Sequence, residues 1–129
     1  MPDRKAPPPN PLETYRSAVS ADPKSAEARC NLGWGYYGQG KYDDAINEFQ
    51  EALKLDMNTV DAYYGLGLAH KGREAKAEAM AAFEKAAVLA SQSPDRVRAQ
   101  MLVRLIHGQL NELKTGDWGL AKELYHREP

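Results

Sequence analysis

The chain repeats one set of residues at a fixed offset of 34 positions, and this period constrains its fold more than any other feature. The first copy comprises Leu32, Gly33, Tyr36, Ala45, Phe49 and Ala52, and the second comprises Leu66, Gly67, His70, Ala79, Phe83 and Ala86. Five of the six positions are identical, and the offset never slips. A unit of this length cannot bury its own apolar face and becomes stable only when it stacks on neighbours. The period therefore predicts an array of stacked units.

This spacing and residue set resemble the tetratricopeptide repeat (TPR), a helix-turn-helix unit. The resemblance implies an all-α fold, a right-handed α-solenoid of TPR helix-turn-helix repeats with about seven helices. It is specific over residues 26–93, partial over 10–25 and 94–126, and absent over 1–9. Two full repeats with helical material at each end meet the requirement of about three units for stability.

We expect a short arm followed by one domain. Residues 1–9 end in three prolines and are predicted to be a disordered Pro-rich arm. The alternative is a polyproline segment that docks on a partner or on the protein's own groove. A single TPR-like domain is expected over 10–129. Its parts are a leading helix (10–25), repeat 1 (26–59), repeat 2 (60–93) and a degenerate third repeat that serves as a cap (94–129).

Capping residues indicate where the helices begin. Ser25 and Thr59 are predicted to be the N-caps of the first helix of each full repeat. Ser93, followed by Pro94 at the first helical position, is predicted to open a longer third-repeat helix. The segment from Gly116 onwards resembles the start of the second helix of repeat 1, so a short final helix is expected to follow, to about residue 126.

Small residues are expected where the helices approach each other most closely. By the family's pattern, the facing pairs are Gly33 with Ala45 and Gly67 with Ala79. Phe49 and Phe83 are expected to fill the gap between one repeat and the next.

The chain departs from the family's pattern in three places. Arg29 and Tyr63 stand where tryptophan is common, Met57 and Ser91 replace the usual closing proline, and Gly35 and Gly38 add to Gly33 in one helix. The acidic residues Asp43, Asp44 and Glu48 are interpreted as solvated positions on the second helix of repeat 1. Asp43 and Asp44 fall in its first turn, where the helix dipole favours negative charge.

The resemblance also implies a concave groove lined by the first helix of each repeat. Its register places eight side chains there, namely Glu27, Cys30, Trp34, Tyr37, Asp61, Tyr64, Leu68 and Lys71. Four of these would form an aromatic and apolar floor, namely Trp34, Tyr37, Tyr64 and Leu68. Large aromatic side chains are common anchors of interfaces, so the groove is predicted to bind a peptide or helix with apolar side chains. The alternatives are a groove filled by the helix from Pro94 or by the Pro-rich arm, and self-association.

The predicted function is non-enzymatic protein–protein interaction, as an adaptor or scaffold. No catalytic residue, metal site or cofactor is predicted, because His70, His107 and His126 are scattered and no phosphate-binding loop follows a strand. A self-assembling structural TPR protein is one alternative. A secretion-type chaperone or a thiol-based regulator that uses Cys30 is another.

One subtype of the family is disfavoured by the residues of the groove. Chaperone-binding members clamp a C-terminal carboxylate with lysine, asparagine and arginine side chains. The matching places here hold Cys30, Trp34 and Gly65, none of which supplies a cation or an amide. The resemblance therefore argues against an adaptor for chaperone tails.

Charge, hydropathy and cysteine content limit the classes of partner and the cellular compartment that we expect. The formal net charge of −1 disfavours nucleic acid, so the expected partner is another protein or peptide, or a second copy of the chain. No apolar run approaches the roughly 18–20 residues that span a bilayer, and the first residues lack the apolar stretch of a signal peptide. Cys30 is the only cysteine, so no internal disulfide can form, and a reducing, cytoplasmic location is expected.

Overall fold

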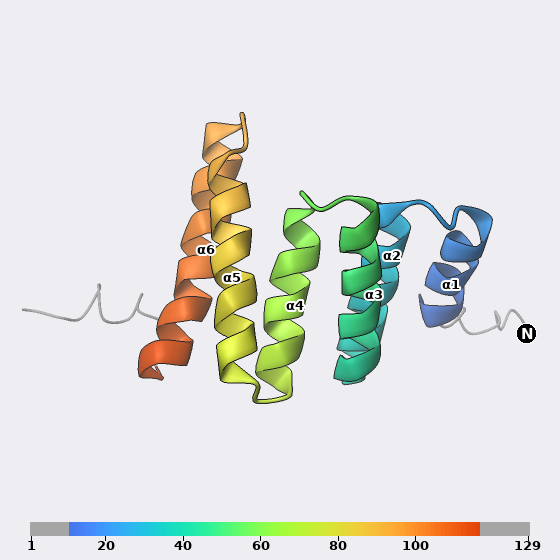
Figure 1. Cartoon of the computed structure of the whole chain (residues 1–129), viewed down its shortest axis with the longest axis horizontal. Helices are drawn as coiled ribbons and strands as arrows, with labels where there is room; N and C mark the ends of the chain where they lie inside the picture. Colours follow the sequence, from blue (N-terminus) through green and yellow to red (C-terminus); the bar gives the residue numbers. More distant parts are fainter. Residues whose placement is uncertain (1–10, 117–129) are drawn as a thin grey trace, which may run out of the picture.

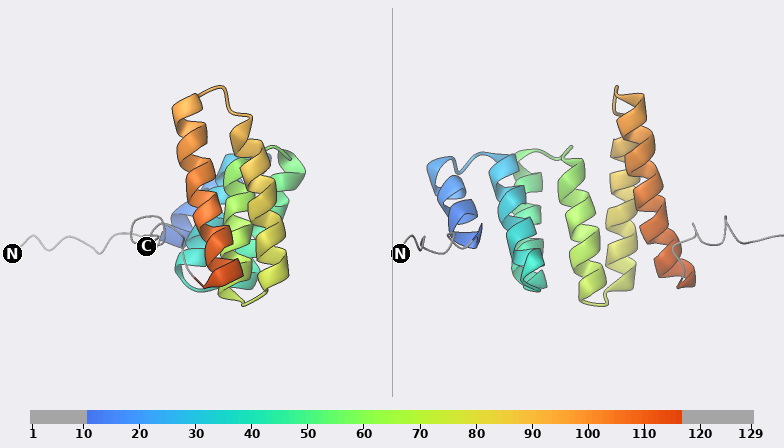
Figure 2. Two further views of the ribbon diagram at one scale, coloured as in Figure 1. Left: turned by 90° about the vertical axis from the view of Figure 1, so that its left-hand side faces the viewer. Right: turned by 180° about the vertical axis from the view of Figure 1, so that it is seen from behind.

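The computed structural model describes residues 11–116, and within that range the chain folds into an α-solenoid of six helices without a strand. The helices are α1 (Pro11–Ala21), α2 (Ala26–Gly38), α3 (Tyr42–Leu55), α4 (Val60–Gly72), α5 (Lys76–Ser91) and α6 (Arg96–Thr115). They stand side by side in chain order, from α1 at one end to α6 at the other (Figure 1). Seen from behind, α2, α4 and α6 lie on the near side and α3 and α5 lie behind them (Figure 2). The seventh helix and the Pro-rich arm that the sequence predicts lie outside the described residues.

The helix boundaries follow the capping residues in part. Ser25 caps α2 as predicted, because its Oγ accepts a hydrogen bond from the backbone N–H of Ala28 at 3.0 Å. Thr59 occupies the N-cap position of α4, but its hydroxyl instead donates to the carbonyl of Asp56 at 2.8 Å. The threonine side chain therefore closes the preceding turn and does not cap the helix.

The start of α6 differs from the prediction. The helix begins at Arg96, and its N-cap is Asp95, whose carboxylate accepts from the backbone N–H of Arg98 at 3.1 Å. Ser93 accepts a hydrogen bond from the N–H of Asp95 and lies before the helix. Both residue types cap well, but a carboxylate also interacts favourably with the positive end of the helix dipole. The prediction that Ser93 and Pro94 open this helix is therefore wrong by two residues.

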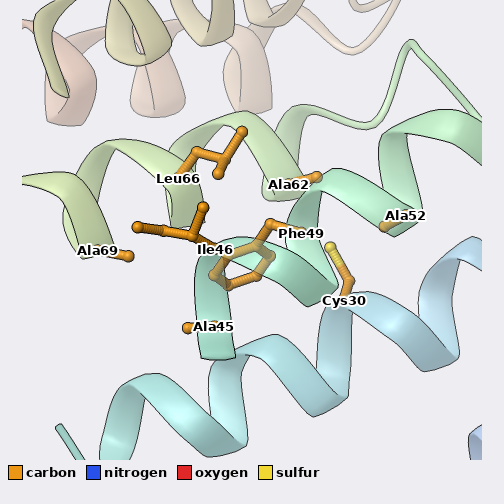
Figure 3. Close-up of a cluster of buried hydrophobic side chains, with 8 residues drawn as sticks. All are labelled: Cys30, Ala45, Ile46, Phe49, Ala52, Ala62, Leu66 and Ala69. Atoms are coloured by element: carbon orange, nitrogen blue, oxygen red, sulfur yellow. The ribbon is translucent and has the colours of Figure 1, made fainter. Parts of the chain in front are cut away.

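The first core cluster lies between α2, α3 and α4, around the fully buried ring of Phe49 (Figure 3). A Cβ atom built on Gly33 of α2 would lie 2.8 Å from this ring, and one built on Gly65 of α4 only 2.3 Å from it. The glycines of two successive repeats thus make room for one phenylalanine, which fills the gap between the repeats as predicted. The nearest atoms to Gly33 belong to Phe49, whereas the sequence had indicated the region of Ala45.

The second core cluster repeats this arrangement one unit further along. Phe83 of α5 is fully buried, and its ring lies 2.4 Å from the position of a Cβ atom on Gly67. Ile106 and Leu110 of α6 join the same cluster, so α6 takes the place of a third repeat's first helix. The repeated phenylalanine therefore joins each helix pair to the next.

An ion pair replaces the tryptophan that is common in the family. Arg29 of α2 contacts Glu48 of α3, with 3.0 Å between the guanidinium Nη1 and the carboxylate Oε1. The side chain of Glu48 is only 12% exposed, so the prediction that it is solvated is wrong. The sequence pattern hides this contact because the two residues lie in different helices. Asp43 is solvent-exposed, as predicted, and contacts Arg73 at the end of α4.

The last two helices are longer than the others on their side of the stack. The helix α6 has 20 residues, whereas α2 and α4 have 13 each. As a result, the connection between α5 and α6 stands beyond the ends of the other helices (Figure 1). This projecting hairpin exposes the first turns of α6.

Candidate functional site

The aromatic side chains predicted to line the groove come together on α2 and α4. Trp34 and Tyr37 are separated by one turn of α2, and their ring centroids lie 6.0 Å apart with the planes perpendicular. Trp34 also approaches Tyr64 of α4, with 6.4 Å between ring centroids. We call Trp34, Tyr37 and Tyr64 the aromatic row. Edge-to-face and tilted pairs at these distances are favourable, so the row is a connected set that spans two repeats.

Buried rings hold the aromatic row from beneath. Trp34 lies against Phe49 at 5.1 Å between centroids, and Tyr64 lies against Phe83 at 5.5 Å. All three members of the row are half-buried, so each offers part of its surface to solvent while the rest is fixed in the core. The two phenylalanines that join the repeats therefore also position the exposed rings.

The remaining predicted residues differ in exposure. Glu27 and Asp61 are exposed and form no salt bridge within residues 11–116, whereas Leu68 is half-buried and packs on the second core cluster. Cys30 is only 4% exposed and belongs to the first core cluster. The face on α2 and α4 thus offers three aromatic rings and one leucine, next to two free carboxylates.

Lys71 is the one cation among the predicted residues, and α6 neutralises it. Its Nζ donates to Oε1 of Gln109 at 2.8 Å and forms an ion pair with Glu112. Gln109 in turn donates from Nε2 to the hydroxyl of Tyr64 at 3.2 Å. Burial lowers the pKa of Lys71 below its ordinary value. This network fastens the last turns of α6 to α4, so α6 borders the Tyr64 end of the aromatic row.

Sequence reasoning missed Gln109 and Glu112, which belong to the site through this network. They lie about 40 residues beyond Lys71 on a helix whose repeat register is degenerate. The available signal was Gln109 itself, a polar residue three positions after the buried Ile106, on the buried side of α6.

Two of the three histidines, His70 and His107, lie in the described part of the chain. His70 is half-buried, as its place in the repeat predicts, and burial lowers its pKa. Its Nδ1 is buried without a hydrogen-bond partner. Across residues 11–116 no three side chains of histidine, cysteine, aspartate or glutamate come together as metal ligands. No helix in this range is long and apolar enough to cross a membrane.

We expect the Cys30 thiol to react with a disulfide reagent at pH 8 on the order of 100-fold more slowly in the folded chain than in urea, because few folded molecules carry a thiolate. Burial, and secondly the nearby Asp61 carboxylate, raise the pKa of Cys30 to about 12. The folded state thus holds this proton above the ordinary thiol range. Because the thiol of the unfolded chain loses its proton first, this group leaves the free energy of unfolding unchanged below about pH 9 and lowers it as the pH rises towards 12.

Stopped-flow absorbance would measure the labelling rate of Cys30. Melting temperatures at pH 7 and pH 10, measured for the native chain and for Cys30→Ala, would give the part of the pH dependence that is due to the thiol. Equal labelling rates in the folded and unfolded chain would contradict the buried position of this side chain.

Two family models match the central part of the chain. A TPR repeat model matches residues 35–72, and a tetratricopeptide repeat model matches residues 60–92. The BBSome complex member BBS4 of Xenopus tropicalis is 37% identical over 68 residues, which are 53% of this chain and 13% of that protein. The chain spans only about a tenth of the length of the curated relatives it matches, between 9% and 13%.

Solved structures resemble the whole stack. The first TPR domain of human RPAP3 superposes with a TM-score of 0.62 at 22% identity, over 80% of this chain and 79% of that domain. The first TPR of Spaghetti (RPAP3), bound to the HSP90 peptide SRMEEVD, gives a TM-score of 0.60 at 23% identity, over 77% and 76% of the two chains.

The fold defines the class of protein as an α-solenoid of helix pairs, each joined to the next by one phenylalanine lodged against glycine. Residues 35–92 of the chain match tetratricopeptide repeats, and the solved structures that share the fold are TPR domains.

Proposed function

We propose that the chain is a non-enzymatic protein-interaction module, an adaptor or scaffold, that binds an apolar segment of another protein on the face formed by α2 and α4. The observation that carries this proposal is the aromatic row, which spans both repeats and rests on Phe49 and Phe83. Because buried rings already fix these side chains, little conformational entropy is lost when a partner orders against them. Cys30 contributes to the core beneath this face and not to the contact surface.

The charges around the row favour a partner with basic residues next to its apolar ones. Glu27 and Asp61 are exposed, whereas the charge of Lys71 is already satisfied by Glu112. The structural neighbour that carries the HSP90 peptide SRMEEVD holds an acidic ligand. An acidic ligand would meet uncompensated carboxylates on the face proposed here, which disfavours this class of partner. The preferred ligand is thus an apolar helix or strand with lysine or arginine beside it.

Site-specific crosslinking would test the proposal. A photo-crosslinking amino acid at Tyr37 would sample the aromatic row, and the same group at Lys54 of α3, whose side chain is 72% exposed, would give the background. We expect adducts with another protein at position 37 that are missing at position 54. The crosslinked segment of that protein should contain apolar side chains next to lysine or arginine.

Adducts formed only with the chain's own residues would contradict the proposal, since the face would then be filled internally or by a second copy. Recovery of an acidic segment at position 37 would contradict the proposed ligand chemistry while leaving the binding face in place.

A further inference from the structure

The helix α6 carries an exposed apolar row that the face on α2 and α4 does not use. Val97, Met101 and Leu105 of α6 are 68%, 67% and 41% exposed. They account for half of the large hydrophobic side chains that are exposed in the described residues. Their spacing of four places them on one side of the helix, over a length of about 12 Å. None of the three side chains belongs to either core cluster, so the core of the solenoid does not explain this row.

The row borders a shallow hollow that would fit a side chain from a partner. The hollow is lined by Val97, Met101 and Leu102, with Asp95 and Arg98 at its edge. An apolar side chain seated there would be surrounded by aliphatic groups and would bury them from water. The surface is thus a shallow depression with an aliphatic lining, which could receive an apolar side chain of a partner.

Cations frame this row on both sides. At about 100° per residue, Arg98 and Arg104 lie about 60° to either side of the row's centre, and Arg96 lies further round the helix. All three are exposed, and none forms a salt bridge within the described range. The nearby Asp95 carboxylate accepts from the backbone of Arg98 as the helix cap. Two free guanidinium groups, those of Arg98 and Arg104, therefore flank an apolar row that carries a single acidic neighbour.

We propose that this side of α6 is a second interaction surface, which binds an amphipathic helix of another protein that carries acidic residues beside its apolar stripe. The charge complementarity identifies the partner's chemistry, because Arg98 and Arg104 would attract carboxylates and repel a basic helix. A second copy of the chain fits less well. An antiparallel pair of α6 helices centred on Met101 would bring Arg98 of one copy opposite Arg104 of the other. The two faces of the solenoid would thus take partners of opposite charge.

A peptide-display selection tests this surface. Libraries of helical peptides with randomised positions would be displayed on a cell surface and sorted for binding to the full chain. The affinity of each selected peptide would then be measured for three variants. Met101→Glu places a charge in the row, and Met57→Glu is the matched control, because Met57 is also exposed, at 70%, and lies in the connection between α3 and α4. Leu68→Glu reports on the face of α2 and α4 and separates the two proposals. Circular dichroism would verify that each variant is folded.

We expect one class of peptide to lose at least tenfold in affinity with Met101→Glu while Met57→Glu and Leu68→Glu leave it unchanged. These peptides should carry apolar residues three and four positions apart with glutamate or aspartate beside them. Arg98→Glu combined with Arg104→Glu should weaken them at least tenfold, and added salt should weaken them as well. The proposal is overturned if no selected peptide distinguishes Met101→Glu from Met57→Glu, or if the distinguishing peptides are neutral or basic.

Two further measurements would overturn it in favour of another occupant. Sedimentation equilibrium that shows a dimer lost in Met101→Glu would assign the row to a second copy. Binding to phosphatidylserine vesicles that is lost in Met101→Glu, together with no acidic peptide, would assign it to a membrane surface. In all these outcomes the result for Leu68→Glu remains a separate test of the first face.

Discussion

Replacing Phe83 with alanine is expected to lower the free energy of unfolding by about 3–5 kcal/mol. The ring is fully buried between Tyr64 and the backbone of Gly67, and it belongs to the cluster that joins α5 to α6. Its removal leaves a cavity at the contact between the second repeat and the helix that covers it. Urea denaturation followed by far-ultraviolet circular dichroism would measure the loss.

The matched control for Phe83→Ala is Val88→Ala, which lies on the same helix with a side chain that is 53% exposed. We expect a change within about 0.5 kcal/mol for this variant. If Phe83→Ala fails to fold, Phe83→Leu leaves a smaller cavity and keeps the loss measurable. Similar stabilities for the Phe83 and Val88 variants would contradict the role of the phenylalanine in joining the repeats.

Replacing Gly65 with alanine is expected to destabilise the chain by about 1–3 kcal/mol, against the usual trend for helices. In a helix interior this change ordinarily stabilises by about 0.5–1 kcal/mol, because alanine loses less backbone entropy. Here the new methyl group would lie 2.3 Å from the ring of Phe49, which is fully buried. The cost of overpacking should therefore exceed the gain in helix propensity.

Gly38→Ala is the control for Gly65→Ala and is expected not to destabilise the chain. Gly38 is exposed at the end of α2, and an added Cβ would meet nothing within 4 Å. Its melting temperature should stay unchanged or rise, whereas that of Gly65→Ala should fall, as scanning calorimetry would show. A rise in both variants would mean that Phe49 does not lodge against Gly65.

Much of this fold could be predicted from the sequence because the repeat period relates positions along the chain to packing positions between helices. Ser25 caps α2 as expected, since a capping residue is recognised from its immediate neighbours in the sequence. The fixed offset also placed Phe49 and Phe83 between successive helix pairs. These features depend on spacing along the chain, which the sequence displays directly.

The features that sequence reasoning missed depend on contacts between distant segments. The sequence pattern predicts a solvated Glu48, whereas Arg29 from the preceding helix pairs with it. Gln109 and Glu112 reach Tyr64 and Lys71 from a helix without a clear repeat register. Side-chain partners of this kind are set by how far each helix extends and how it crosses its neighbours, and no local pattern encodes that.

The repeat register predicts where the candidate face lies, but not which of its side chains are available to a partner. The register put Trp34, Tyr37 and Tyr64 on one face, and their ring contacts are consistent with this placement. It also put Cys30 there, yet this thiol is only 4% exposed within the core. The register also put Lys71 there, and its charge is paired with Glu112. Because Cys30 is buried and Lys71 is paired, the face retains its aromatic rings and the carboxylates of Glu27 and Asp61.

Amide chemical-shift mapping tests the central claim most directly. The segment identified by crosslinking at Tyr37 would be titrated into the isotope-labelled full chain, and the shifts followed residue by residue. We predict that the perturbations gather on α2 and α4 and include the indole N–H of Trp34, while α3 and the exposed side of α5 remain unchanged. Shifts confined to α3 and α5, or to Val97–Leu105 of α6, would contradict the assignment of the aromatic row as the binding face.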